Sequence, residues 1–257
     1  MSATTRATAI RTTSLAATGR NTKSTPSLWD TANAKLDIKS RKSLASVDVG
    51  NGRVVDAVLK EAVTQQRALA AKRWKATIGG KEVILRDVLA KIIRWVDHFK
   101  AVGDIAVQCN SGAASLPWAA VRFLLQVAVN DKQYLEATIE GIEMVTQKIA
   151  TYAAMEDLYM DSDFQLHTQI RSKVLGLYVH ILSFLAESIQ YFKIDTPSRT
   201  AKGAFSTNQG GRLRQIARHD TEIRQLAKMC DSHAQRLIRK DVMRIDENIM
   251  TSLKAPR

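Results

Sequence analysis

The longest apolar stretch of the chain runs from Leu116 to Val129, where only Arg122 and Gln126 interrupt the hydrophobic residues. It is shorter than the ~20 residues that a membrane-spanning helix needs, so it predicts a helix buried in a protein core. Fixing each backbone residue costs about 1–2 kcal/mol, and this helix offsets that cost only if neighbouring elements bury its large side chains. We therefore predict an all-α, multi-helix bundle around a central apolar helix at about 116–130.

Apolar residues recur every three or four positions along most of the remaining chain, which is typical of amphipathic helices. This spacing predicts further helices at about 28–45, 53–75, 87–106, 131–159, 161–192 and 213–250. Their short connections indicate antiparallel neighbours in a bundle. The segment 77–85, TIGGKEVIL, predicts a small extended turn, because its two glycines can adopt the positive φ angles that tight turns demand.

Arg122 is the one cation inside the apolar stretch. A guanidinium is expensive to bury without a carboxylate partner, so one interpretation is an internal ion pair. In the other, Arg122 reaches the surface together with Gln126, which lies one turn further along the same face. The sequence leaves both open.

The last predicted helix is amphipathic, with its two faces carrying different chemistry. At 100° per residue, its apolar side collects Ile216, Ile223, Cys230, Ala234 and Leu237. The opposite side collects Arg214, Arg218, Lys228, Arg236 and Arg239, which form the candidate interaction face. This face could be a solvated surface, a contact with a partner helix or domain, or a contact with an anionic membrane.

The formal net charge of +13 attracts anionic surfaces without specifying one. Nucleic acid is not the expected partner, because stacking aromatics do not alternate with the basic residues and no nucleic-acid motif accompanies them. Residues 1–27 are basic and contain no acidic residue. They predict a disordered tail, with a mitochondrial targeting signal as the alternative.

The remaining domain is expected at 28–252, with a linker at about 196–211 that is rich in Ser, Thr and Gly. Cys109 and Cys230 are the two cysteines and form no CxxC pair, so we expect neither disulfides nor a zinc site. A reducing compartment, the cytoplasm, fits this usage. Import into mitochondria is the alternative location.

No residue set predicts catalysis. Lys81 follows two glycines, but the next residue is Glu82 where a phosphate loop needs Ser or Thr. The five histidines form no HxxxH or HExxH pair, and no nucleophile signature or calcium loop is present. We therefore expect no catalytic residue, no cofactor, no metal and no enzyme activity.

Several short blocks of the chain carry a family resemblance. They comprise Leu28–Asp30, Trp74–Lys75, Ile78–Val83, Arg86–Asp87, the residues Lys91, Ile92, Trp95 and Phe99, then Val102–Asp104, Leu116–Asp131, Tyr152 and Met155–Tyr159. Their order between Leu28 and Phe192 resembles the N-terminal helical domain of fungal NWD-type NACHT NTPases, which are NLR-like STAND proteins. The combination of IGGKEV with PWAAV carries most of this likeness.

The resemblance implies a non-catalytic signalling or protein-interaction module that precedes an NTPase switch in receptors of fungal immunity. It implies a protein partner, either a second copy of the chain or a NACHT-type receptor. The alternative is a membrane-associating effector that acts through its basic amphipathic surface. Because the chain has no phosphate loop, it is expected to be a stand-alone effector, a truncated product or a fragment of a longer receptor.

Overall fold

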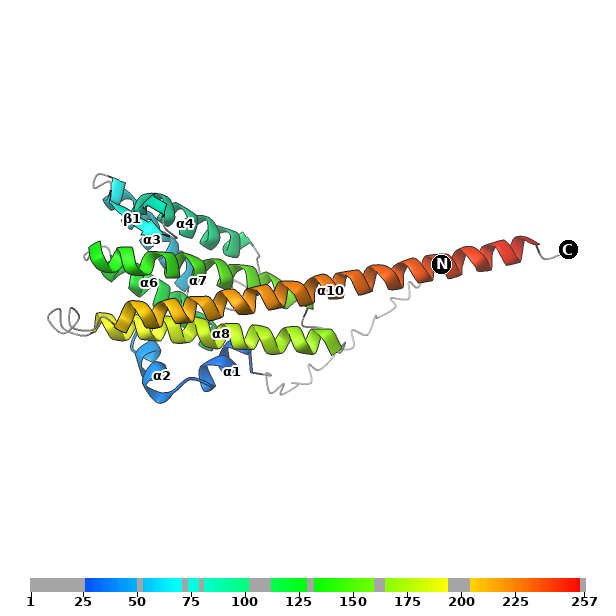
Figure 1. Ribbon diagram of the computed structural model, residues 1–257, viewed down its shortest axis with the longest axis horizontal. Coiled ribbons are helices and arrows are strands. Elements are labelled where there is room, and N and C mark those ends of the chain that lie inside the picture. Colours follow the sequence, from blue (N-terminus) through cyan, green and yellow to red (C-terminus); the bar gives the residue numbers. More distant parts are fainter. Residues whose placement is uncertain are drawn as a thin grey trace, which may run out of the picture.

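The computed structural model describes residues 26–49, 53–70, 74–78, 81–101, 112–128, 132–159, 165–193 and 204–254. The predicted tail lies outside these residues up to position 25, and so does the predicted linker between 196 and 203. Nearly all of the described chain is helical (Figure 1), which confirms the predicted all-α class.

The elements follow one another as a series of helices interrupted by one hairpin. They are α1 (Leu28–Ala34), α2 (Ile38–Ala45), α3 (Val54–Ala70), β1 (Lys75–Ile78), β2 (Lys81–Ile84), α4 (Leu85–Ala101), the 3-10 helix η1 (Gly112–Ser115), α6 (Leu116–Ala128), α7 (Lys132–Tyr159), α8 (Gln165–Phe192) and α10 (Ala204–Lys254). Strands β1 and β2 are antiparallel, with Lys75 opposite Ile84 and Ile78 opposite Lys81. This hairpin corresponds to the extended turn predicted at 77–85, but it begins two residues earlier, at Lys75.

The centre of the bundle is shared by α6 and α8. Helix α8 packs against α1, α2, α6, α7 and α10, while α3 and α4 complete the far side of the core against α6 and α7 (Figure 1). The predicted central helix is buried along most of its length, with Trp118, Val121, Leu124 and Leu125 fully enclosed. Trp118 packs on Phe99 of α4 at a ring-centroid distance of 4.7 Å.

The prediction of one continuous helix at 28–45 was wrong. The chain leaves α1 after Ala34 and starts again at Asp37, whose side chain accepts a 2.8 Å hydrogen bond from the backbone N–H of Ser40. Asp37 is thus an N-cap that begins a second helix. The break lets both helices lie on α8, where Trp29 stacks on Tyr178 at 3.6 Å between ring centroids.

Two further predicted bounds were wrong. Helix α3 ends at Ala70, and Lys75, predicted to be helical, belongs to β1. The final helix begins at Ala204, nine positions before the predicted Leu213, so residues 204–211 belong to a helix instead of a linker. In both places the contacts made by the element override the local preference of the sequence.

Arg122 follows the surface interpretation. Its side chain is half-buried, and it makes no hydrogen bond or ion pair with any described residue. Gln126, its neighbour one turn on, is exposed and donates a 3.1 Å hydrogen bond to Glu61 Oε2 of α3. The carboxylate beside this face therefore pairs with the amide and not with the guanidinium.

One described helix, α8, is long and apolar enough to cross a membrane by length and composition. Within the fold, 61% of its most apolar window is buried. That burial is what a core helix of a bundle requires, so the length and composition of α8 are accounted for by its central position.

Two helical glycines provide a test of the packing between α7 and α8. A Cβ atom on Gly141 would lie 2.3 Å from Cζ of the fully buried Phe184, whereas a Cβ on Gly211 would meet nothing within 4 Å. We expect Gly141→Ala to lower the free energy of unfolding by about 1–3 kcal/mol through overpacking. Gly211→Ala should raise it by about 0.5–1 kcal/mol, because alanine favours helix. Urea denaturation measures both, and equal signs would contradict the packing described.

Candidate functional site

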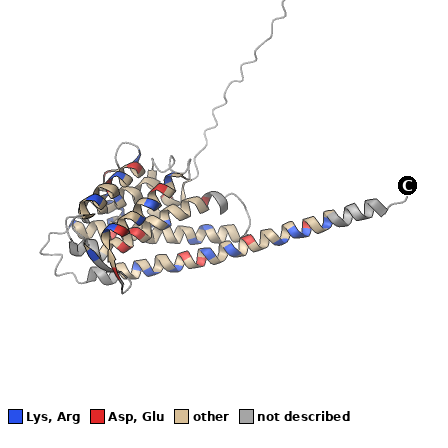
Figure 2. Cartoon of the chain, turned by 90° about the horizontal axis from the view of Figure 1, so that it is seen from above, with Lys and Arg blue, Asp and Glu red and all other residues tan. Residues whose placement is uncertain are grey.

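Helix α10 is the element on which the candidate interaction face lies. Its 51 residues make a rod about 75 Å long. The first half packs along α8 and touches α7, and the second half extends beyond the body of the protein (Figures 1 and 2). The packed half, which we call the seam, and the protruding half have different chemistry.

Apolar side chains form the middle of the seam. Ile216 and Ile223 are fully buried, and Ala227 and Cys230 nearly so. They follow a spacing of seven, four and three residues, which keeps one side of α10 against the body. The predicted apolar side of this helix is therefore confirmed as far as Cys230.

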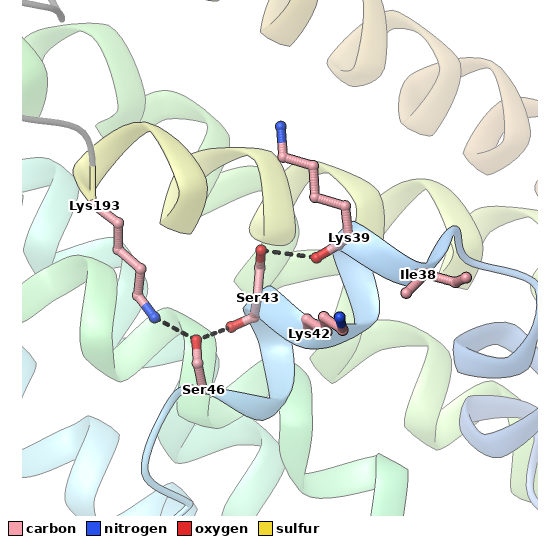
Figure 3. Close-up of a pocket in the computed structure, with 6 residues that line it drawn as sticks. All are labelled: Ile38, Lys39, Lys42, Ser43, Ser46 and Lys193. Carbon is pink, nitrogen blue, oxygen red and sulfur yellow. Dashed lines mark hydrogen bonds between the residues drawn. The ribbon is translucent and has the colours of Figure 1, made fainter.

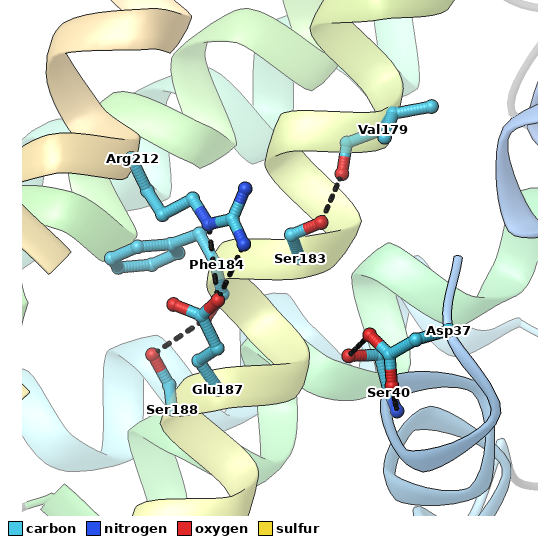
Figure 4. Close-up of polar contacts among 8 residues, drawn as sticks. All are labelled: Asp37, Ser40, Val179, Ser183, Phe184, Glu187, Ser188 and Arg212. Carbon is cyan, nitrogen blue, oxygen red and sulfur yellow. Dashed lines mark hydrogen bonds and ion pairs between the residues drawn. The ribbon is translucent and has the colours of Figure 1, made fainter. Parts of the chain in front are cut away.

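Three polar contacts fix α10 lengthwise on α8. Gln209 Nε2 donates to Ser188 Oγ at 2.6 Å. The Arg212 Nε and Nη2 atoms both donate to Glu187 Oε1, at 3.0 and 2.8 Å (Figure 4). Further along, Lys173 Nζ lies 2.7 Å from Glu222 Oε2. Because the partners run in opposite directions along the two helices, these contacts set the antiparallel register of the seam.

A buried charge network joins α10 to α7. Asp220 Oδ2 lies 2.9 Å from Lys148 Nζ and 3.1 Å from Arg224 Nε, while Tyr152 donates its hydroxyl to Asp220 Oδ1 at 2.8 Å. The Lys148 and Asp220 side chains are only 8% and 14% exposed. Burial alone would raise the pKa of Asp220, but the hydrogen bonds from Lys148 and Tyr152 outweigh it and hold that pKa below its usual range. Burial, together with the bond to Asp220, raises the pKa of Tyr152.

Two histidines meet in the seam. The rings of His180 on α8 and His219 on α10 lie 5.2 Å apart between centroids, and His219 packs over Gly176. Both Nδ1 atoms are buried and have no hydrogen-bond partner among the described residues. Burial lowers the pKa of each imidazole. The pKa of His180 is lowered further by His219 and then by Arg212. At His219, Glu222 raises the pKa, while Lys173 and Arg218 lower it, and the net shift is downward.

The protruding half of α10 exposes large apolar side chains. We call four of them the apolar stripe: Leu237, Ile238, Val242 and Ile245. The stripe lies on the same half of the helix circumference as Ile216 and Ile223. Ile238, Val242 and Ile245 are 64%, 52% and 54% exposed. The stripe thus continues the face that the body buries, past the point where the body ends.

Two residues of the predicted apolar side are not buried. Ala234 and Leu237 belong to the apolar side of α10, but both are exposed. Helix α8 begins at Gln165, so along an antiparallel seam no described part of α8 reaches these positions. The helical pattern gave the correct side of α10, while the length of its partner decides where burial stops.

All five residues of the candidate interaction face, Arg214, Arg218, Lys228, Arg236 and Arg239, lie on α10 and are exposed. Figure 2 shows that basic residues recur along the coloured part of this helix, with acidic residues among them. Arg218 Nε pairs with Glu222 at 2.9 Å, and Arg236 Nε donates to the backbone oxygen of Ser232. The face is thus a basic surface that is partly neutralised, and its role stays a prediction.

Sequence reasoning missed the Asp220 network and the histidine pair. A signal for the first was available: Lys148 and Tyr152 are one turn apart on α7, and Asp220 and Arg224 are one turn apart on α10. His180 and His219 are far apart in sequence, and only the antiparallel register brings them together. No group of three or more His, Cys, Asp or Glu that could hold a metal occurs among the residues described.

A comparison with known protein families matches residues 28–247 to the N-terminal domain of NWD NACHT-NTPase. The match covers most of the chain, including the seam and the whole apolar stripe. No curated protein and no solved structure matches the chain.

The Asp220 network gives a prediction for stability. We expect Asp220→Asn to lower the free energy of unfolding by about 3–5 kcal/mol, because Lys148 would keep a buried charge without a carboxylate. Asp241→Asn is the matched control, since Asp241 forms an exposed pair with Arg244 and its loss should cost less than about 1 kcal/mol. Urea denaturation measures both variants. Equal effects would show that the network does not anchor α10.

The histidine pair predicts a dependence of stability on pH. Because the folded pKa of each imidazole lies below its ordinary value of 6.5, the unfolded chain binds protons more readily. Stability should be complete above pH 6.5 and fall as the pH drops from there towards the folded pKa. The double variant His180→Gln, His219→Gln should lose this slope. The test measures the urea midpoints of the wild type and the double variant between pH 7.5 and 5.5. If the midpoints of both proteins fall equally with pH, the prediction is contradicted.

Proposed function

Because the chain belongs to the family of N-terminal domains of NWD NACHT-NTPases, we propose that it is a signalling module that binds a partner protein through the protruding half of α10. The single observation that carries this proposal is the exposed apolar stripe on a helix whose same face is buried nearer the body. Large contiguous apolar surfaces on soluble proteins mark interaction sites. Ile238, Val242 and Ile245 are spaced by four and then three residues, which suits contact with another helix.

The charges around the stripe favour one kind of partner. Arg236, Arg239, Lys240 and Arg244 flank it, and Asp241 is the one acidic residue between positions 236 and 245. Two copies placed side by side would bring like charges together, which opposes association. An acidic helical surface of a NACHT-type receptor would instead match both the apolar residues and the cations. Self-association is the second form that the interaction could take.

We propose further that the domain acts without catalysis and in the cytoplasm. The family match supports the first point, because the matched family is described as the N-terminal domain that accompanies an NTPase. The cytoplasmic location is supported by the cysteines, which form no CxxC pair. Cys230, the cysteine in the described part of the chain, is a buried free thiol.

The test compares two variants of the full chain. The stripe variant replaces Ile238, Val242 and Ile245 by Gln. The control replaces Met229 and Met243 by Gln, because these two side chains are similarly exposed but lie on the other half of α10. Because all five side chains are exposed, neither variant should unfold the protein. We expect the stripe variant to weaken binding to the NTPase domain of a NACHT-type receptor at least tenfold, measured by calorimetry, and the control to bind as the wild type does.

Light scattering after size exclusion separates self-association from receptor binding in the same samples. A concentration-dependent mass that disappears in the stripe variant would show that a second copy is the partner. A wild-type chain that stays monomeric and binds no receptor would refute the proposed function.

A membrane-associating effector is the second candidate, favoured by the combination of an apolar stripe and basic residues on one exposed helix. This function requires the wild-type chain to co-sediment with phosphatidylserine vesicles. Added salt should weaken that binding, and the stripe variant should lose it. Equal binding by both variants would remove it.

A further inference from the structure

A cavity lies at the surface between α2 and the end of α8, on the opposite side of α8 from α10 (Figures 3 and 4). Its volume is about 450 Å³, and it is open to solvent on one side. It is lined by Ile38, Lys39, Lys42, Ser43, Ser46 and Lys193. Three of these six residues are cations, and none is acidic.

The three lysines of the cavity are not neutralised. Lys39, Lys42 and Lys193 form no ion pair within the described part of the chain. Other lysines of the bundle do: Lys100 lies 2.6 Å from Asp56, and Lys173 pairs with Glu222. Clustered cations without a counter-charge raise the local concentration of anions and favour their binding.

One of the lysines is held in place. Lys193 Nζ donates to Ser46 Oγ, and the Ser46 hydroxyl in turn donates to the backbone oxygen of Ser43 at 2.6 Å (Figure 3). An ammonium group has three donors, so this bond leaves two for a ligand. Because Ser46 fixes the head of a flexible side chain, less conformational entropy is lost when an anion binds.

The helix that carries the other lysines is also anchored. Asp37 caps α2 through Ser40, whose side chain is buried, and Leu44 is buried against the body. Lys39 and Lys42 therefore project from a fixed helix. Ile38 is 65% exposed at the edge of the same cavity and offers an apolar contact beside the cations.

A simpler account covers only part of this arrangement. Lys42 lies in the last turn of α2 and Lys193 directly follows α8, and cations at such positions interact favourably with the helix dipole. Lys39 lies in the first turn of α2, where the dipole disfavours a cation. The dipole also gives no reason for the fixed position of Lys193 above the cavity.

We propose that this cavity binds a phosphate-bearing anion, with Lys39, Lys42 and Lys193 as its donors and Ile38 against the less polar part of the ligand. Lysine binds phosphate as a compact charge, and charge-assisted hydrogen bonds are the strong ones. A soluble polyphosphate and a phosphoinositide headgroup share this chemistry. The site is separate from the α10 surface, so it goes beyond the interaction proposed above.

The experiment titrates the full chain with inositol hexakisphosphate by calorimetry. The cavity variant is Lys42→Gln with Lys193→Gln, and the matched control is Lys60→Gln with Lys91→Gln, which removes the same charge from exposed positions elsewhere. We expect one binding event for the wild-type chain, a loss of affinity of about tenfold per lysine in the cavity variant, and less than a twofold change in the control. Ser46→Ala should weaken binding to a smaller extent.

Vesicles of phosphatidylcholine, with and without phosphatidylinositol bisphosphate, distinguish the two sources. Binding to the phosphoinositide vesicles that the cavity variant loses identifies a headgroup, and binding of the soluble probe alone identifies a free phosphate. Equal losses in the cavity variant and the control, or no binding by the wild type, would overturn the proposal. Thermal midpoints of all variants establish that they remain folded, and receptor binding through α10 should stay unchanged in the cavity variant.

Discussion

The burial of α8 is the constraint on which the bundle depends. This helix is apolar over most of its circumference, and it is enclosed only because helices from both ends of the chain cover it. Helices α1 and α2 lie on one side, α10 on another, and α6 and α7 in the core (Figure 1). The hydrophobic effect sets no orientation by itself, so the covering helices need further contacts to fix their register.

Polar groups provide that register for α10. The contacts of Gln209, Arg212 and Glu222 fix its position along α8, and Asp220 fixes it against α7. A buried ion pair adds little net stability when both partners are present, but a shifted helix would leave charges buried and unpaired. The network therefore selects one arrangement of the seam over neighbouring ones. The lysines around the α2 cavity lie outside it and keep their charges available.

The sequence predicted those elements whose pattern is strong enough to decide them locally. The apolar residues of α6, the glycine pair between β1 and β2 and the apolar side of α10 all belong to this class. The break at Asp37 was missed because continuous helical spacing on both sides concealed the cap. The early start of α10 was missed because its first residues favour loops, whereas in the fold Gln209 is buried against Ser188. The exposure of Leu237 could not be predicted, since no local pattern says where its partner helix ends.

The continuity of α10 has a mechanical consequence. An unbroken helix is stiff over its whole length, so a displacement at the seam reaches its far end without being absorbed on the way. From Ile223 to Lys254 the rod measures about 45 Å, and a tilt of about 10° at the seam would swing its end through ~8 Å. The helix thus has the geometry of a lever, in which a small tilt at the seam becomes an end movement close to the spacing of about 8–10 Å between packed helix axes.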